Sequence, residues 1–348
     1  FSNFRKKSLD SKSVGLRLVK ALEELGPTFI KLGQFLGTRP DIVGKDLAIE
    51  LQSLQDDLPP FAMSIAKQSI IDEIGQEKFN EIKNLSEPIA AASIAQVHFA
   101  NIDEKQFAIK ILRPGIEKRF NDELEALMLF ASIVESLLPK TRRLKLIEVV
   151  HLLKEITTIE MDLRFEGSAA SELKKNTDQD PKFKVPNINW DFTSKRILTS
   201  EKVDGIKIKD LNRINELKID KKELAKNIIQ NFLRQAVGDG FFHGDMHQGN
   251  LFVDKEGNII PVDFGIMGRL DKDNRKYLAE ILYGFIQRDY EKVAEVHFIA
   301  GLVPADQSKD SFSQALRSIG EPIFGQSIKN ISAGKLLAQL FEITEQFN

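Results

Sequence analysis

The sequence has 348 residues, enough to form two or three lobes around sizeable hydrophobic cores. Its 49 Lys and Arg residues nearly balance its 51 Asp and Glu residues, which excludes a bulk electrostatic attraction to nucleic acid or to an acidic membrane. Cysteine is absent, which excludes disulfides, cysteine-based zinc sites and thiol catalysis, and no run reaches the roughly 18 apolar residues of a membrane-spanning helix.

The first sixty residues are predicted to be helical. Leucines recur at helical spacing up to the Gly26-Pro27 break, and two further helices are expected at 28–36 and 46–54. Lys31 and Gln34 lie three positions apart and therefore share one face of an otherwise apolar helix. Such a helix is buried, so its polar side chains need partners; the alternative is a lysine whose long side chain reaches solvent.

From Pro88 the pattern changes to strands. Residues 94–102 and 106–112 are predicted to form a hairpin through the polar turn 103–105. Because side chains alternate along a strand, Lys110 points away from the apolar face of the second strand. A lysine in this place is typical of the phosphate-binding lysine of kinases, and a solvated edge lysine is the alternative.

The remainder is predicted to be mainly helical, with long helices at 117–138 and 144–175, a strand at 196–203 and an amphipathic helix at 221–237. We assign the apolar side of that last helix to Ile228, Ile229, Phe232, Leu233 and Ala236. Short strands are expected at 251–253 and 259–262. After Asp271 we expect helices with breaks near Pro304 and Pro322, then a polar helix at 336–347.

This order divides the chain into three predicted parts. Residues 1–60 form a helical extension, residues 61–203 a smaller lobe that contains strands and inserted helices, and residues 204–348 a larger and mostly helical lobe.

The strongest chemical signal is the stretch that contains Asp245 and Asn250. Asn250 follows Asp245 by 250 − 245 = 5 positions, the spacing of the base and the metal-binding Asn in a kinase catalytic loop. The two strands that follow bring Asp263, of Asp263-Phe264-Gly265, beside them, and carboxylate and amide oxygens suit Mg²⁺. Taken singly, Asp245 and Asn250 would be turn-capping residues, but the combination favours a kinase-type site.

The two histidines of this stretch, His243 and His247, invite a zinc interpretation because they are four residues apart. Gly244 and Gly249 indicate a loop and not a helix, so zinc is the lesser alternative. We expect His243 to pack or hydrogen-bond beneath the catalytic loop.

An alanine-rich stretch occupies the place of a kinase's glycine-rich phosphate loop. It contains Ala90, Ala91, Ala92 and Ser93, upstream of Lys110. Alanine disfavours positive φ and keeps the backbone farther from the phosphates, so the geometry of nucleotide binding should differ from that of ordinary kinases.

Three elements now make a family resemblance specific: Lys31-Leu32-Gly33-Gln34, the alanine-rich loop, and Glu160-Met161-Asp162. With the catalytic loop and Asp-Phe-Gly, they make nearly the whole chain resemble the UbiB/ADCK family of atypical protein-kinase-like ATPases. Other kinase-like families lack both the Lys-x-Gly-Gln element and the alanine-rich loop. The resemblance implies an α+β, bilobal protein-kinase-like fold with a helical N-terminal extension packed over the active site.

The resemblance also implies roles for single residues. The helix of Lys31 and Gln34 would block the place of a protein substrate and meet Glu160 and Asp162, which makes these four residues regulatory. Lys110 would hold the α- and β-phosphates of ATP or ADP and pair with Glu166. Asp245 would be catalytic together with Lys110, and Asn250 and Asp263 would bind Mg²⁺. Nucleotide contacts would come from Ala90, Ala91, Ala92 and Ser93. Met246 and Gln248 replace the family's usual prolines, which should change loop stiffness but not chemistry.

The family is tied to ubiquinone (coenzyme Q) biosynthesis at a membrane. The resemblance therefore implies an ATPase or a lipid-directed kinase at the cytoplasmic face of a bacterial inner membrane, or at the mitochondrial matrix face. The implied partners are lipid-like ubiquinone precursors or the membrane surface, and other ubiquinone-biosynthesis proteins, but not nucleic acid. We hypothesise that the native protein continues past Asn348 into a membrane anchor; release of the full-length protein from membranes by salt alone would contradict this.

Three other classes stay open. A small-molecule phosphotransferase of the aminoglycoside or choline kinase type shares the His-Gly-Asp-x-x-x-x-Asn pattern, but lacks the Lys31/Gln34 element and the alanine-rich loop. An ordinary protein kinase is disfavoured because no Ala-Pro-Glu segment follows Asp263. A nucleotide-dependent scaffold without turnover is disfavoured by the intact set of Lys110, Asp245, Asn250 and Asp263.

Overall fold

The computed structural model describes residues 11–54, 58–138 and 144–324, together with Gln339, Ile343 and Phe347. The predicted polar helix at 336–347 lies outside the described residues except for those three. The chain forms two compact units: the first comprises Phe1–Lys175, Lys184–Ile206 and Ile260–Gly265, and the second comprises Asn176–Phe183, Lys207–Ile259 and Ile266–Asn348.

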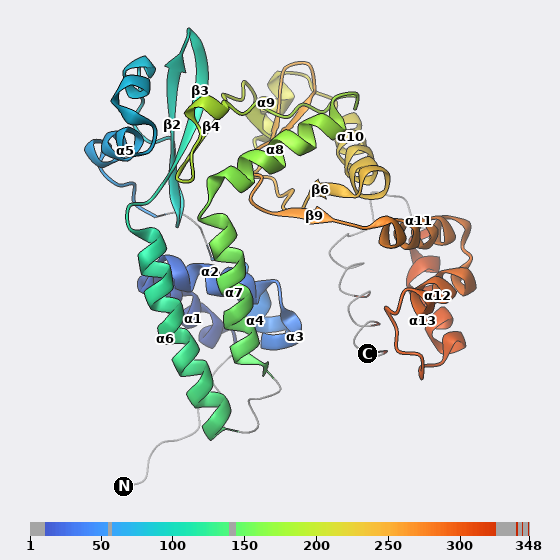
Figure 1. Cartoon of the computed structure of the whole chain (residues 1–348). Helices are drawn as coiled ribbons and strands as arrows, with labels where there is room; N and C mark the ends of the chain where they lie inside the picture. The colour runs from blue at the N-terminus through green and yellow to red at the C-terminus, as the bar shows by residue number, and fades with distance from the viewer. Residues whose placement is uncertain are drawn as a thin grey trace. The chain divides into compact units, whose positions relative to one another are not determined.

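The N-terminal part of the first unit is a group of four helices (Figure 1). They are α1 (Ser11–Leu25), α2 (Pro27–Gly37), α3 (Pro40–Val43) and α4 (Lys45–Leu51). Buried Val19, Leu22, Leu51 and Leu54 form their common core. The predicted helix at 46–54 is confirmed as α4, but it ends at Leu51. The short helix α3 was not predicted; it starts with a proline at its first position, and Gly44 with φ 83° separates it from α4.

The four-stranded sheet of the first unit is antiparallel, with strand order β1-β2-β3-β4. Its strands are β1 (Ala90–Ala91), β2 (Ala95–Ile102), β3 (Lys105–Leu112) and β4 (Ile197–Glu201). The predicted β2–β3 hairpin is confirmed, but its turn has two residues and not three. Asp103 and Glu104 both have positive φ, 46° and 63°, as a type I′ turn requires, so Lys105 already belongs to β3.

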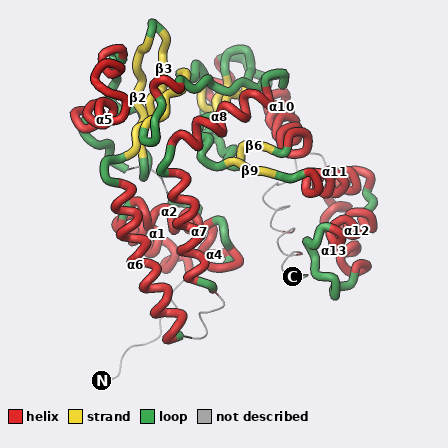
Figure 2. Tube along the Cα trace, viewed as in Figure 1, coloured by secondary structure: helices red, strands yellow, loops and turns green. Residues whose placement is uncertain are grey.

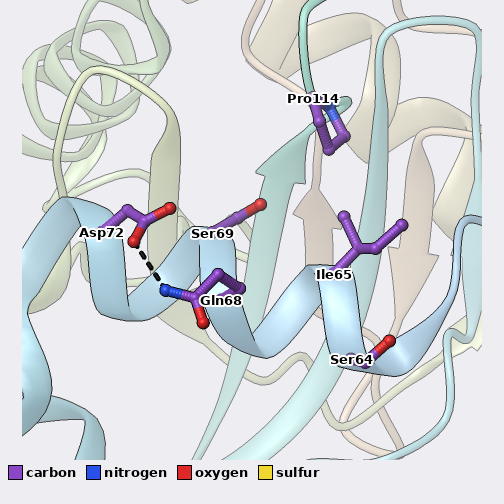
Figure 3. A pocket seen from close by; sticks show the side chains of 6 residues that line it. All are labelled: Ser64, Ile65, Gln68, Ser69, Asp72 and Pro114. Carbon is purple, nitrogen blue, oxygen red and sulfur yellow. Dashed lines mark hydrogen bonds between the residues drawn. The ribbon is translucent and has the colours of Figure 1, made fainter.

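One face of β3 carries the core of this lobe. Phe107, Ile109 and Ile111 are buried as their alternation predicts, and they pack with Ala66 and Ile70 of α5 (Met63–Glu81). Figure 2 shows α5 in red beside the yellow strands. Figure 3 shows an open surface depression between α5 and Pro114, in which Gln68 Nε2 donates to Asp72 Oδ1 at 2.7 Å.

Three long helices complete the first unit: α6 (Ile116–Leu137), α7 (Leu146–Glu160) and α8 (Leu163–Thr177). Figure 1 shows α6 and α7 running side by side. The single helix predicted at 144–175 was wrong, because it divides at Met161-Asp162. The Asp162 carboxylate accepts the backbone N–H of Arg164 at 3.1 Å, and Leu163 N donates to Lys195 O at 2.8 Å. These two bonds satisfy the free N–H groups at the start of α8, so α8 begins as a new helix.

The second unit is mostly helical. Its helices are α9 (Leu211–Glu216), α10 (Lys221–Leu233), α11 (Lys272–Gln287), α12 (Tyr290–Ile299) and α13 (Lys309–Phe324). Short strands form two small sheets, β5 (Ile206–Lys207), β7 (Leu251–Val253) and β8 (Ile259–Pro261) in the order β5-β7-β8, and β6 (Phe241–His243) with β9 (Met267–Arg269). The unit boundaries run through β5 and β8.

One sequence prediction for this unit was wrong in part. In the helix predicted at 221–237, which contains α10, the apolar side was partly misplaced: Ala236 is buried as predicted, but Ile229 is 60% exposed, whereas Leu224 and Asn231 are buried. Leu224 and Asn231 are two helical turns apart and so share the buried face, whereas Ile229 is five residues from Leu224 and lies on another face. The α-helix ends at Leu233 and continues as the π-helical segment η3 (Arg234–Asp239). α13 includes Pro322 and is described as far as Phe324, so the break expected near Pro322 stays a prediction.

Candidate active site

Lys110 stands at the centre of a small charged cluster in the first unit. Its Nζ donates to Glu166 Oε2 at 2.8 Å and Oε1 at 3.0 Å, and lies 3.4 Å from Asp263 Oδ1. β3 supplies the lysine and α8 supplies the glutamate, so the break before α8 directly sets the position of Glu166. Lys110 and Glu166, which the sequence analysis pairs, are therefore in contact.

The charges in this cluster stabilise each other. Burial opposes the charge on Lys110, but the carboxylates of Asp263 and Glu166 outweigh it and raise the pKa of the ammonium group well above its usual value. The positive charge of Lys110, helped by Lys31, holds the pKa of Asp263 below its usual value although burial opposes this. Burial raises the pKa of Glu166, and Lys110 offsets part of that rise. At neutral pH, Lys110 is thus a cation and Asp263 an anion.

Asp263 has an uncommon backbone. Its φ of 61° lies in the left-handed region, which residues other than glycine adopt rarely, although Asp and Asn tolerate it best. The side chain is 53% exposed, while the following Phe264 is only 4% exposed. The anchored phenylalanine thus holds an accessible carboxylate beside Lys110. Strained backbone of this kind is concentrated at functional sites.

The N-terminal helices reach the same cluster. Lys31 of α2 forms an ion pair with Glu160 of α7 at 2.9 Å, and both side chains are largely buried, at 18% and 11% exposure. Asp162 forms an ion pair with Arg164, with Nη2 at 2.6 Å from Oδ2, and its contact with α2 stays a prediction. This pair lowers the pKa of Asp162. Gln34 lies on the same helix and is partly buried.

The alanine-rich loop joins β1 to β2. Ala90 and Ala91 form β1 and pair with Val97 and Gln96, and Ala92 N donates to Ala95 O at 2.7 Å. Ser93 is fully buried. The loop is therefore a tight turn within the sheet, with Ala90 the most exposed of its alanines. A feature that the sequence analysis missed is Arg113, whose Nε donates to Ala92 O at 2.9 Å; its only sequence signal is its place before Pro114-Gly115.

In the second unit, the catalytic-loop residues form their own network. Asn250 Nδ2 donates to Asp245 Oδ2 at 3.1 Å and to Asp245 O at 3.2 Å, so the Asn250 side-chain oxygen is the atom left to accept a cation. His243 is 1% exposed, and its Nδ1 accepts Asp245 N–H at 3.1 Å, as expected for a residue beneath the loop. His247 Nδ1 accepts Gly249 N–H at 2.9 Å, and its Nε2 lies 3.6 Å from Asp245 Oδ2.

Comparisons with known proteins identify the family. The chain matches the ABC1 atypical kinase-like domain over residues 53–297 and the UbiB helical domain over residues 316–348. It is 40% identical to a probable protein kinase UbiB of Marinobacter nauticus, over 97% of this chain and 62% of that protein. A relative of the same name from Azotobacter vinelandii is 39% identical, over 99% of this chain and 65% of the relative.

The fold has a solved counterpart. The Mycobacterium tuberculosis protein Rv3197, solved with erythromycin, superposes with a TM-score of 0.58 at 20% identity, covering 97% of this chain and 92% of that one. This likeness concerns the fold, and with the domain match it confirms the kinase-like α+β fold.

The chain spans 62–65% of the length of those two curated relatives. Within the residues that the structure describes, no helix combines the length and the apolar character needed to cross a membrane.

Proposed function

The chain belongs to the UbiB family of ABC1 atypical kinase-like proteins, and from that membership we propose that it is a Mg²⁺-dependent ATP-binding ATPase or kinase that supports ubiquinone biosynthesis at a membrane. One observation carries the proposal: a strand lysine, Lys110, is bound to a helix glutamate, Glu166, and to the Asp of Asp-Phe-Gly, Asp263. This is the arrangement that kinases use for phosphoryl transfer.

The ammonium group of Lys110 can donate a hydrogen bond to a nucleotide phosphate. An ammonium group has three donors, and two of its present bonds go to Glu166. A nucleotide phosphate would take the third donor in place of the longer contact to Asp263, at 3.4 Å. Glu166 would then keep Lys110 charged and aimed, while Asp263 would be released to act as a metal ligand. Lys110 would thus link phosphate binding to the availability of the Asp263 carboxylate for Mg²⁺.

The residues proposed to hold Mg²⁺ fit a hard cation. Asp263 offers an exposed carboxylate and Asn250 an amide oxygen whose companion nitrogen is already bound to Asp245. The bound cation would supply charge neutralisation on the phosphates. Asp245, held by Asn250 and through its N–H by His243, would accept the proton of the attacking hydroxyl or water.

The N-terminal helices favour a lipid-like substrate over a protein. Lys31 of α2 is bound to Glu160 and adds its charge to the field at Asp263. A helix anchored beside the reacting groups leaves less room for an extended peptide. We therefore propose that the enzyme acts on or mobilises lipid-like ubiquinone precursors, at the cytoplasmic face of a bacterial inner membrane or the mitochondrial matrix face, alongside other proteins of this pathway.

Phosphate release from MgATP tests the proposal. Wild type is compared with Asp263→Asn, which removes one charge from the metal ligand but retains a residue that tolerates positive φ. The matched control is Asp271→Asn: Asp271 caps α11 by accepting Asn274 N–H at 2.8 Å, and Asn caps a helix as well as Asp does. Each protein is assayed with and without anionic liposomes.

We expect turnover in wild type and in Asp271→Asn, a loss of turnover in Asp263→Asn, and a rise with liposomes. Unchanged hydrolysis in Asp263→Asn would refute the site. Tight nucleotide binding without phosphate release from any variant would instead favour a scaffold, and stoichiometric phosphate uptake by a soluble small molecule would favour a phosphotransferase of the aminoglycoside or choline kinase type.

A further inference from the structure

Arg113, just after β3, joins two segments that are far apart in the sequence. Its Nε donates to Ala92 O at 2.9 Å, and its Nη2 donates to Pro59 O at 3.0 Å and to Leu58 O at 3.4 Å. We propose that Arg113 positions the alanine-rich nucleotide loop and couples it to the segment 58–61, which follows the N-terminal helices in the chain. The inference rests on the proposed function, since that function makes the loop a nucleotide contact.

At the loop, Arg113 completes a set of backbone bonds. Ala92 N donates to Ala95 O at 2.7 Å, and Arg113 N donates to Ile94 O at 2.8 Å, so main-chain bonds hold the turn from the strand side. The guanidinium adds a side-chain bond to the turn, at the carbonyl of Ala92. A turn fixed in this way is ordered before a nucleotide arrives, and pre-ordering reduces the entropy lost on binding.

The Nη2 group of Arg113 binds the segment 58–61, which β2 also binds. Phe61 N donates to Gln96 Oε1 at 2.8 Å, and Gln96 Nε2 lies 3.3 Å from Phe61 O. Gln96 is fully buried, and its amide nitrogen also lies 2.8 Å from His98 Nε2. The Arg113 guanidinium lies 5.8 Å from the centre of the Phe61 ring. The segment 58–61 is thus anchored both to β2 and to Arg113.

The same segment leads directly out of the N-terminal helices. Leu54 is 6% exposed and packs in the core of α1 and α4, together with Leu22 and Leu51. Leu58 follows Leu54 by four positions, so the segment that Arg113 holds is the one next to the N-terminal helices in the sequence.

The chemistry of arginine suits this role. A guanidinium presents its donors in a rigid planar fork and can serve two carbonyls in fixed directions at once, whereas a lysine ammonium is a compact point charge on a flexible stem. Arg113→Lys should therefore keep the charge but not both bonds, and Arg113→Gln should lose the charge as well.

Two measurements on the whole chain test the inference. The first is hydrogen exchange of the Ala92 and Phe61 amides, with and without MgADP. The second is the Kd for MgADP. Wild type is compared with Arg113→Gln, Arg113→Lys and the control Arg119→Gln. Arg119 also holds a carbonyl of the N-terminal helices, Leu25 O at 3.1 Å, but it pairs with Glu123 and lies away from the alanine-rich loop.

We expect Arg113→Gln to speed exchange at Ala92 and to weaken MgADP binding by about tenfold, because charge-assisted bonds that pre-order the loop are lost. Arg113→Lys should be intermediate, and Arg119→Gln should match wild type at Ala92. MgADP should slow exchange at Phe61 in wild type but not in Arg113→Gln.

Unchanged exchange at Ala92 in both Arg113 variants would overturn the inference, as would equal Kd values with a folded Arg113→Gln. If wild type binds no MgADP, the proposed function fails and the coupling to nucleotide falls with it, whereas exchange at Ala92 in nucleotide-free protein still decides whether Arg113 holds the loop.

Discussion

Replacing Glu166 by Gln tests the charged cluster without changing its shape. Glu166 is 8% exposed and accepts two hydrogen bonds from Lys110, at 2.8 and 3.0 Å. Glutamine keeps the size of the side chain but removes the negative charge. Lys110 would then remain a buried cation whose strongest partner has become neutral.

The size of the effect follows from burial. Removing one partner of a buried ion pair costs about 3–5 kcal/mol, because the remaining charge is left uncompensated. Here Asp263 stays 3.4 Å from Lys110 but is 53% exposed, so solvent screens it and it offsets about 1 kcal/mol at most. We therefore expect the free energy of unfolding to fall by about 3 kcal/mol.

Urea unfolding followed by tryptophan fluorescence is a suitable assay, since Trp190 is the single tryptophan of the chain. Its indole ring lies against α8, only 3.2 Å from the position that a β-carbon on Gly167 would occupy. The matched control is Glu148→Gln, which breaks an exposed pair with Lys145 and should cost about 0.5 kcal/mol or less.

A double replacement sharpens the test. Lys110→Met combined with Glu166→Leu should recover much of the lost stability, because an apolar pair of similar volume needs no compensating charge. A Glu166→Gln protein as stable as Glu148→Gln would refute the account of a buried, mutually dependent pair.

Three further changes test other parts of the structure. Gly33→Ala should lower the free energy of unfolding by about 1–3 kcal/mol, since its β-carbon would lie 2.2 Å from Leu54 Cδ1; an unchanged urea midpoint would contradict this packing. Ala92→Gly should shift nucleotide affinity, because glycine lets the backbone approach the phosphates; titration calorimetry that gives the wild-type affinities for both ATP and ADP would contradict it. Burial lowers the pKa of His297, so the unfolded chain binds more protons and stability should be lost as pH falls below about 6.5. Urea midpoints at several pH values should show this slope in wild type and less of it in His297→Gln.

Local patterns were sufficient to predict β2, β3 and β4 of the four-stranded sheet, but not the short strand β1. The β2–β3 hairpin follows from alternating apolar residues on both sides of a polar turn, and its pairing is local. The failures arose where side chains override periodicity. Apolar spacing runs smoothly through Met161-Asp162, but the bonds from the Asp162 carboxylate to Arg164 start a new helix there. In α10, periodicity cannot reveal that the helix widens into η3.

The motif residues were identifiable one by one, because spacing in the chain is enough to mark Asp245 and Asn250. Contacts between distant segments were harder to predict. The pairing of Lys110 with Glu166, and of Lys31 with Glu160, came from family resemblance and not from spacing. Arg113 was missed altogether, since its partners lie 21 and 54 positions away and are backbone carbonyls, which leave no trace in residue types.

The path of the chain through the two units determines which fragments contain the whole charged cluster. The first unit comprises Phe1–Lys175, Lys184–Ile206 and Ile260–Gly265, and the second comprises the stretches between and after them. Asp263 therefore belongs to the first unit, although the sequence on both sides of its short stretch belongs to the second. A fragment that ends at a unit boundary before residue 260 would contain Lys110 and Glu166 but not Asp263.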